Sequence, residues 1–203
     1  MASEQETLIA QNEEAYRAAM AALARSHEWG ELYSDEFVRS YVGSDEDPTW
    51  NIKVEGPLNK PAQVALEYFE GHWNQFQEEL AGIVKKSEIQ KVYPDGSKLC
   101  HEELNFTQGS QHLWGYHTRK AEADGIVEEV ISDAYLPELP SERAFRLNFL
   151  LVQFIPIDDH SSQLRAIIAI TPPVAVPADK RRELSILRAV FYSRIVQQVR
   201  LVI

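Results

Sequence analysis

The chain has 203 residues, of which 44% are hydrophobic and 25% charged, and its formal net charge at pH 7 is −11. This composition is typical of a soluble globular protein, and the length suits one domain over residues 1–203. The acidic balance argues against a nucleic-acid partner, because phosphate contacts need clustered Lys and Arg.

Several sequence features predict a cytoplasmic protein. The single cysteine, Cys100, cannot form an internal disulfide, and the first twenty residues lack the apolar core of a signal peptide. The longest apolar runs, such as residues 166–170, are too short to cross a bilayer. The acidic segment 43–48 lacks the ligand spacing of an EF-hand loop, so we expect a solvated turn there.

The predicted elements begin with a helix over residues 4–25, in which Leu8, Ala15 and Ala19 recur at helical spacing. Three strands follow, over 27–34, 36–43 and 49–58. Residues 61–80 predict two short helices, with Pro61 in the first turn and Gly71 between them.

The second half of the chain predicts six more strands and a last helix. Short turns between successive strands favour an antiparallel meander. The last helix, 179–200, places Leu184, Leu187, Phe191, Ile195 and Val199 on one stripe, so it is the expected cover of the sheet. The pattern predicts an α+β fold whose later strands span 82–93, 97–106, 110–120, 125–132, 143–157 and 162–171.

Three segments carry a resemblance to a known family. They are "IKVEGPLNKPAQVALEYFEG" followed by "HWN", "CHEEL" on the fifth strand, and Pro177 before the last helix. With the element order, they resemble the START (StAR-related lipid-transfer) domains of the helix-grip, or Bet v1-like, group. The resemblance implies a curved nine-stranded antiparallel sheet wrapped around the C-terminal helix, with an apolar tunnel for one lipid and a polar pair deep inside it.

The hairpin of the fifth and sixth strands predicts the binding residues. Pairing Phe106 with Ser110 gives one apolar face that also carries Glu102 and His112. Glu102 either lies at the solvated rim, pairs with His112, or anchors the polar end of a lipid, since an unpaired buried carboxylate is costly. The aromatic residues on this face are either simple core or tunnel lining. The predicted ligand-binding set is Glu102, Leu104, His112, Trp114, Tyr116 and Phe149, with Arg119 and Arg146 as possible counter-charges.

Two segments are candidates for gating the tunnel. The loop 133–142 is stiffened by two prolines and offers Tyr135, Leu136 and Leu139 as a lid, together with Leu187 and Phe191 of the last helix. Lys180, Arg181 and Arg182 at the start of that helix could dock on an anionic membrane. The alternative is an ordinary helix with a solvated polar face.

No cofactor motif is present, and His112 and His117, five apart on a strand, point to opposite faces and do not predict a metal site. The leading hypothesis is a monomeric, non-catalytic protein that binds one lipid or sterol for intracellular transfer or sensing, with transient membrane contact. One alternative is a cyclase/aromatase-type helix-grip enzyme that uses Glu102 and His112 as acid and base. The other is a protein-interaction domain without a cavity.

Overall fold

The secondary structure follows the predicted order closely. The computed structural model describes residues 3–25, 29–43, 49–80, 82, 84–106, 109–121, 124–139, 146–172 and 176–201, so most of the acidic segment 43–48 lies outside the described residues. The helices are α1 (Glu4–Ala24), α2 (Ala62–Leu80) and α3 (Ala178–Leu201). The strands are β1 (Gly30–Ser34), β2 (Arg39–Val42), β3 (Trp50–Leu58), β4 (Val84–Val92), β5 (Lys98–Phe106), β6 (Gly109–Ala121), β7 (Val127–Asp133), β8 (Arg146–Asp158) and β9 (Ser161–Thr171).

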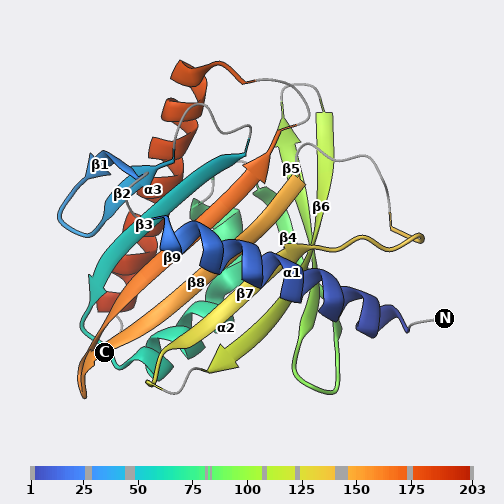
Figure 1. Cartoon of the computed structure of the whole chain (residues 1–203), viewed down its shortest axis with the longest axis horizontal. Coiled ribbons are helices and arrows are strands. Elements are labelled where there is room, and N and C mark those ends of the chain that lie inside the picture. The colour runs from blue at the N-terminus through green and yellow to red at the C-terminus, as the bar shows by residue number, and fades with distance from the viewer. Residues whose placement is uncertain are drawn as a thin grey trace.

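The nine strands form one curved antiparallel sheet in the order β1-β2-β3-β9-β8-β7-β6-β5-β4 (Figure 1). Strands β4 to β9 form the predicted meander, and each pairs with the next strand in the chain. The pairing of β3 with β9 joins the first three strands to this meander, with Trp50 opposite Ile170 and Leu58 opposite Ser162. The α+β class and the nine-stranded antiparallel sheet are therefore confirmed.

Helices cover both faces of the sheet. In Figure 1, α1 crosses one face, here called the outer face, while α2 and α3 lie against the other, the inner face. The inner face holds the larger apolar core, which includes Val54 and Phe154 from the sheet, Phe69 from α2, and Phe191 and Ile195 from α3. The long C-terminal helix packs against the sheet as predicted.

The segment after β3 differs from the prediction, because α2 is one continuous helix of 19 residues rather than two short ones. Gly71 is exposed, and a Cβ added there would meet nothing within 4 Å, so the glycine lowers helix propensity without breaking the helix. Phe69, Trp73 and Phe76 flank it at helical spacing and are all buried. Burial of these aromatic side chains stabilises the helix enough to keep it continuous at Gly71.

Helix α1 is fixed to the outer face by one buried polar side chain. Asn12 Nδ2 donates hydrogen bonds to the backbone carbonyls of Tyr116 and Val130 at 3.1 and 3.2 Å and to Ser132 Oγ at 3.2 Å. Thr118 Oγ1 donates to Asn12 Oδ1 at 2.6 Å. Because every polar atom of this amide is used, α1 has one register on the sheet.

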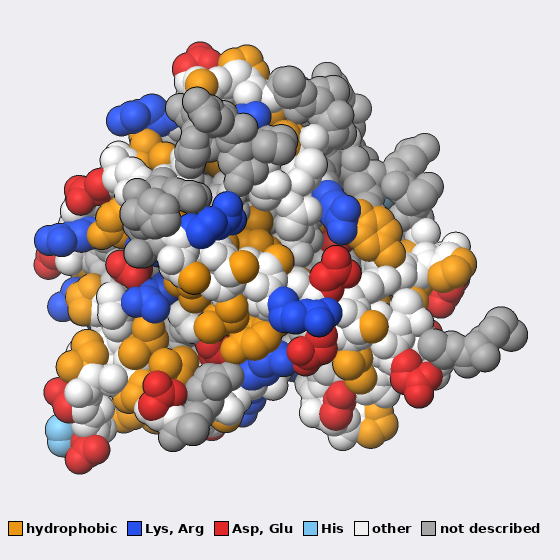
Figure 2. Space-filling view, viewed as in Figure 1, with side chains coloured by type: hydrophobic (Ala, Val, Ile, Leu, Met, Phe, Trp, Pro, Cys, Tyr) orange, Lys and Arg blue, Asp and Glu red, His pale blue; other side chains and the backbone are white. Residues whose placement is uncertain are grey.

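The charges on the outer face are mixed. Figure 2 shows Lys and Arg side chains interspersed with Asp and Glu over the face that carries α1. Lys120 and Glu13 form one such pair between β6 and α1, with Nζ and Oε1 2.5 Å apart. The negative net charge is therefore not gathered into a single field on this face.

Helix α3 passes very close to β3. A Cβ added at Gly56 would lie 2.6 Å from the carbonyl oxygen of Phe37 and 3.1 Å from Val196 Cγ2. Ser193 Oγ also donates a hydrogen bond to Asp35 Oδ2 at 2.7 Å, which ties α3 to the β1–β2 connection. The absence of a side chain at Gly56 is what allows α3 to sit this close to the sheet.

Candidate functional site

The β5–β6 hairpin has a register that differs by one residue from the predicted one. Phe106 pairs with Gly109, and Glu102 pairs with Leu113, where the prediction had paired Phe106 with Ser110. Because side chains alternate along a strand, this shift moves every β6 side chain to the other face. The β5 side chains keep the predicted faces.

His112, Trp114 and Tyr116 therefore lie on the outer face, and their predicted place in the interior is wrong. Trp114 and Tyr116 pack in the small cluster that includes Leu8 of α1. His112 stacks on His101, with its Nδ1 2.9 Å from His101 Nε2. Since Glu102 and His112 are on opposite faces, they do not form the acid–base pair of the enzyme hypothesis.

Phe149 also lies on the outer face, contrary to the prediction. The pairing of β8 with β9 shifts between Leu147 and Phe149, a bulge that interrupts the alternation. Leu147 remains in the inner core, whereas Phe149 packs against Ala15 and Ala19 of α1.

Glu102 and Leu104 lie on the inner face as predicted, and both are buried. Burial raises the pKa of the Glu102 carboxyl, although the positive charges of His117 and Arg188 and the indole of Trp73 act in the opposite direction. No carboxylate–cation pair within ion-pair distance involves Glu102 in the described part of the chain. Burial therefore opposes ionisation of this carboxyl.

Five polar side chains gather around this carboxyl, and together with Glu102 they form what we call the interior polar cluster. They come from both inner helices and from three adjacent strands, and they sit within an otherwise apolar core. Tyr192 is completely buried, and Arg188 stacks on its ring at 5.4 Å. The cluster consists of Trp73, Glu102, His117, Glu129, Arg188 and Tyr192.

His117 and Glu129 form a buried pair within the cluster. His117 Nδ1 lies 2.8 Å from Glu129 Oε1, and the exposed fractions of these residues are 5% and 3%. Burial lowers the pKa of His117, but the Cys100 thiol and the Glu129 carboxylate outweigh burial and raise it to about 10. Gly115 leaves room for the ring, because a Cβ there would lie 3.3 Å from His117 Nε2.

Four polar atoms of the cluster make no hydrogen bond of ordinary geometry within the described ranges, although the Trp73 indole is near enough to lower the pKa of Glu102, and Arg188 that of Tyr192. They are Trp73 Nε1, Arg188 Nε, the Tyr192 hydroxyl and Glu129 Oε2, and all are buried. A buried polar atom without a partner costs about 1–3 kcal/mol. Such atoms indicate that a ligand or ordered water completes the site.

The two arginines predicted as counter-charges for Glu102 contact other residues. Arg119 shares a face with Glu102, but its guanidinium binds the Glu70 carboxylate through two contacts at 3.1 and 3.2 Å near the rim. Arg146 is exposed and lies 5.7 Å from the centre of the Tyr135 ring. The cations that act on Glu102 are His117 and Arg188.

The described part of the predicted lid lies over the outer face. Tyr135 is held by Gln11 of α1 through backbone hydrogen bonds of 2.9 and 3.0 Å, and Leu136 and Leu139 pack against the cluster around Tyr116. The rest of that loop, residues 140–142, falls outside the described ranges. Of the helix residues assigned to the lid, Phe191 is buried in the inner core, whereas Leu187 is 59% exposed.

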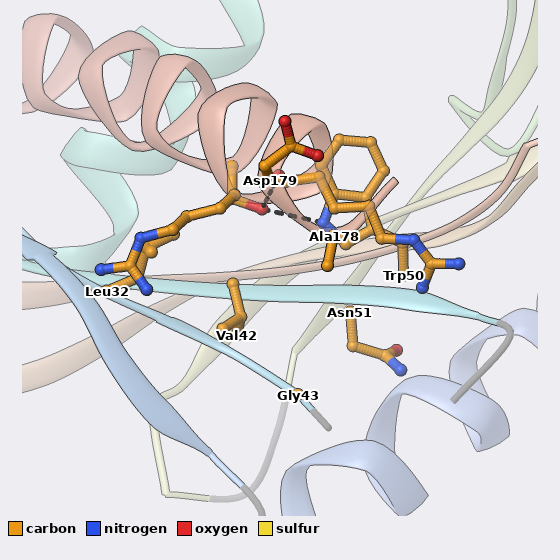
Figure 3. Close-up of a pocket in the computed structure, with 10 residues that line it drawn as sticks. Leu32, Val42, Gly43, Trp50, Asn51, Ala178 and Asp179 are labelled. Carbon is orange, nitrogen blue, oxygen red and sulfur yellow. Dashed lines mark hydrogen bonds between the residues drawn. The ribbon is translucent and has the colours of Figure 1, made fainter. Parts of the chain in front are cut away.

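A pocket of about 210 Å³ lies between β1–β3 and the first turns of α3 (Figure 3). Trp50 Nε1 donates to Ser185 Oγ at 2.8 Å, and Ser185 Oγ donates to the Arg181 carbonyl at 2.8 Å. The Leu32 and Val42 side chains line the pocket on the strand side. Two of the predicted docking residues, Arg181 and Arg182, also line it, whereas Lys180 pairs with Glu183.

Sequence reasoning missed most of the interior polar cluster. The available signal was the spacing of Arg188 and Tyr192, which are four apart on α3 and interrupt its apolar stripe, together with the alternation that links His117 to Glu102 once the register is known. Among the residues that the structure describes, no three His, Cys, Asp or Glu side chains are grouped to hold a metal ion. No helix in the same residues is long and apolar enough to cross a bilayer.

Comparison with known proteins identifies the fold. No protein-family model matches the sequence, and no curated protein matches it either. The structure is similar to human StAR-related lipid transfer protein 5, with a TM-score of 0.75 and 11% identity over 97% of both chains. Human STARD10 gives 0.69 and 10% identity, over 98% of this chain and 81% of the other.

A bacterial structure agrees with the two human ones. The STAR-related lipid transfer protein of Xanthomonas axonopodis gives a TM-score of 0.65 and 15% identity, over 85% of this chain and 99% of the other. At such identities the likeness concerns the fold. The sequence-based resemblance is confirmed at that level, and the chain has the helix-grip fold of the START lipid-transfer domains.

Proposed function

We propose that this protein binds one hydrophobic ligand, a lipid or sterol, between the inner face of the sheet and helices α2 and α3. The interior polar cluster holds the polar end of the ligand, and the apolar core around it holds the body. The observation that carries this proposal is the set of four buried polar atoms without partners inside an apolar interior. The fold agrees with it, since the similar solved structures are named as lipid transfer proteins.

Access to the interior requires movement of α3. The pocket of about 210 Å³ is smaller than the roughly 300–1,000 Å³ of typical ligand sites. Ser185, which lines the pocket, precedes Arg188 of the cluster by three residues on α3, or about 4.5 Å along the helix axis. A small displacement of the first turns of α3 would join the pocket to the cluster.

The same end of α3 suits contact with a membrane. Lys180 and Arg182 are exposed there, and the neighbouring Leu184 and Leu187 are 43% and 59% exposed. Basic residues beside exposed leucines favour an anionic lipid surface. In this proposal, peripheral and transient docking of α3 opens the pocket toward the bilayer, and the protein transfers or senses its ligand.

The test begins with the purified full chain. Native mass spectrometry should show a co-purified hydrophobic molecule, and lipid or sterol probes should raise the melting temperature by linkage. Glu102→Leu should keep the fold and weaken probe binding by roughly ten-fold or more, the scale of a lost hydrogen bond to a charged or polar group. Glu103→Leu is the matched control, because Glu103 lies next to it on the outer face. If no probe binds and no ligand co-purifies, a protein-interaction domain without a cavity is the better account.

A further inference from the structure

The atoms of the interior polar cluster that lack a hydrogen-bond partner include more donors than acceptors. Two of them are donors, Trp73 Nε1–H and Arg188 Nε–H, the Tyr192 hydroxyl can both donate and accept, and Glu129 Oε2 is an acceptor. Burial raises the pKa of Tyr192 to about 12, so its hydroxyl keeps its proton at neutral pH. The balance therefore calls for a ligand group that mainly accepts hydrogen bonds.

The charges of the cluster also favour a ligand group that accepts hydrogen bonds. His117 and Glu129 balance each other across 2.8 Å, and Glu102 is buried without an ion-pair partner in the described residues. Arg188 is always charged, and no carboxylate of the described residues lies within ion-pair distance of it. Arg188 therefore brings to the cluster a positive charge that no described carboxylate pairs with, and an anionic group would balance it.

We infer that the polar end of the ligand is a carboxylate, so that the protein takes a long-chain fatty acid or a similar apolar acid. This inference rests on the proposed function and adds the chemical class of the ligand. The Arg188 fork and the Tyr192 and Trp73 donors, which come from two helices, would receive the two carboxylate oxygens. Glu102 faces the same group from the sheet side, and it would donate a further hydrogen bond in its protonated form.

Neighbouring aromatic rings orient the Arg188 guanidinium for binding a carboxylate. Its guanidinium stacks on the Phe191 ring at 4.4 Å and on the Tyr192 ring at 5.4 Å, so its plane is held by aromatic side chains. A planar guanidinium matches a carboxylate with two parallel hydrogen bonds. An amine or a quaternary ammonium head group would meet like charge from Arg188 and His117, and an alcohol would leave the Arg188 charge uncompensated.

The test compares ligands with one hydrocarbon chain and different polar ends. Oleate, oleyl alcohol, methyl oleate, oleylamine and oleoyl lysophosphatidic acid are titrated below their aggregation concentrations into the delipidated full chain at pH 8. We expect oleate to bind about ten- to hundred-fold more tightly than the alcohol or the ester, the factor that hydrogen bonds to charged groups supply. Oleylamine should bind most weakly.

Two variants connect that preference to the cluster. Arg188→Met should remove the preference for oleate over oleyl alcohol while leaving the alcohol affinity nearly unchanged, and Tyr192→Phe should reduce it in part. Arg194→Met is the matched control, because Arg194 is exposed on the same helix. If Arg188→Met does not fold, the ligand series with the unmodified protein still decides the question.

The possible results separate this inference from the proposed function. Equal binding of oleate, alcohol and ester would overturn the carboxylate and leave lipid binding intact. Tighter binding of oleoyl lysophosphatidic acid than of oleate would overturn it in favour of a phosphate group. Failure of all five compounds, together with sterol probes, would overturn lipid binding itself.

Discussion

At the scale of single residues, His117 and Glu129 make stability depend on pH. The pKa of His117 is raised to about 10 in the folded protein, above its value of about 6.5 in an unfolded chain. The folded state therefore binds the proton more tightly, and the stabilisation is complete below pH 6.5 and lost as the pH rises toward 10. The charged or titratable groups that act on the ring are Cys100, Glu102 and Glu129.

We predict that His117→Leu lowers the free energy of unfolding by about 3–5 kcal/mol at pH 6, because it leaves the Glu129 carboxylate buried without its cation. The difference from the unmodified protein should shrink between pH 6.5 and 10, as measured by urea unfolding across that range. His160→Leu, in the exposed β8–β9 turn, is the control. A difference that stays constant with pH would mean that His117 is neutral in the folded protein, and Glu129→Gln offers a second route if His117→Leu does not fold.

Single residues also show what the sequence could predict about the site. The placement of Glu102 and Leu104 followed from alternation on β5 alone and was right. Arg188 and Tyr192 were missed, because recognising their role required knowing which sheet residues face α3. The role of a partly buried cation can be recognised only from its neighbours, and these come from strands distant in the sequence.

At the scale of elements, Asn12 determines how α1 sits on the sheet. We predict that Asn12→Ala costs about 1–3 kcal/mol of stability, because the hydroxyls of Thr118 and Ser132 and two backbone carbonyls lose a buried partner. Chemical unfolding monitored by circular dichroism measures this cost. Glu14→Ala, on the exposed side of the same helix, should change stability by less than about 0.5 kcal/mol. Equal effects of the two substitutions would show that the buried amide adds nothing specific.

We predict that replacing glycine by alanine has opposite effects on stability at Gly56 and at Gly71. Gly56→Ala should cost about 1–3 kcal/mol, because the new methyl group would lie 2.6 Å from a backbone oxygen that cannot easily move. Gly71→Ala should stabilise by up to about 1 kcal/mol, since it adds helix propensity in open space. Thermal unfolding of both variants measures these effects, and a tolerated alanine at Gly56 would mean that the backbone around Phe37 can move away from β3.

The elements also show where prediction from sequence failed. The order and type of the strands and long helices were readable from periodicity, but the split of α2 was wrong because the buried aromatic stripe outweighs one glycine. The faces of β6 and β8 were wrong because a one-residue shift in a hairpin and a bulge at Leu147 each reverse alternation. Neither leaves a signal in the composition of its strand.

At the scale of the whole molecule, the proposed docking end of α3 is basic on an acidic protein. We predict that the double substitution Lys180→Glu and Arg182→Glu slows the transfer of a fluorescent lipid from anionic vesicles, while binding of a soluble probe is unchanged. Arg181 is left in place, because its Nε donates a hydrogen bond to the Val176 carbonyl at 3.0 Å. The measurement is the transfer rate from anionic and from neutral vesicles at several salt concentrations.

The control for this prediction has the same change in net charge. Arg17→Glu with Arg39→Glu replaces two exposed arginines on α1 and β2, away from the start of α3. We expect nearly normal transfer from this variant. If both double variants slow transfer equally, or if the rate from anionic vesicles does not respond to salt, overall charge rather than a docking surface governs the contact.

The pairing of β3 with β9 has a consequence for how the protein is made. Leu58 and Ser162 are neighbours in the sheet but roughly a hundred positions apart in the chain. During synthesis on the ribosome, β3 leaves the exit tunnel early. The edge of β3 that pairs with β9 then stays without a partner while β4 to β8 are translated. An unpaired strand edge invites pairing with other chains. The nascent chain should therefore depend on chaperones, or on a slow late step, until its ninth strand emerges and closes the sheet.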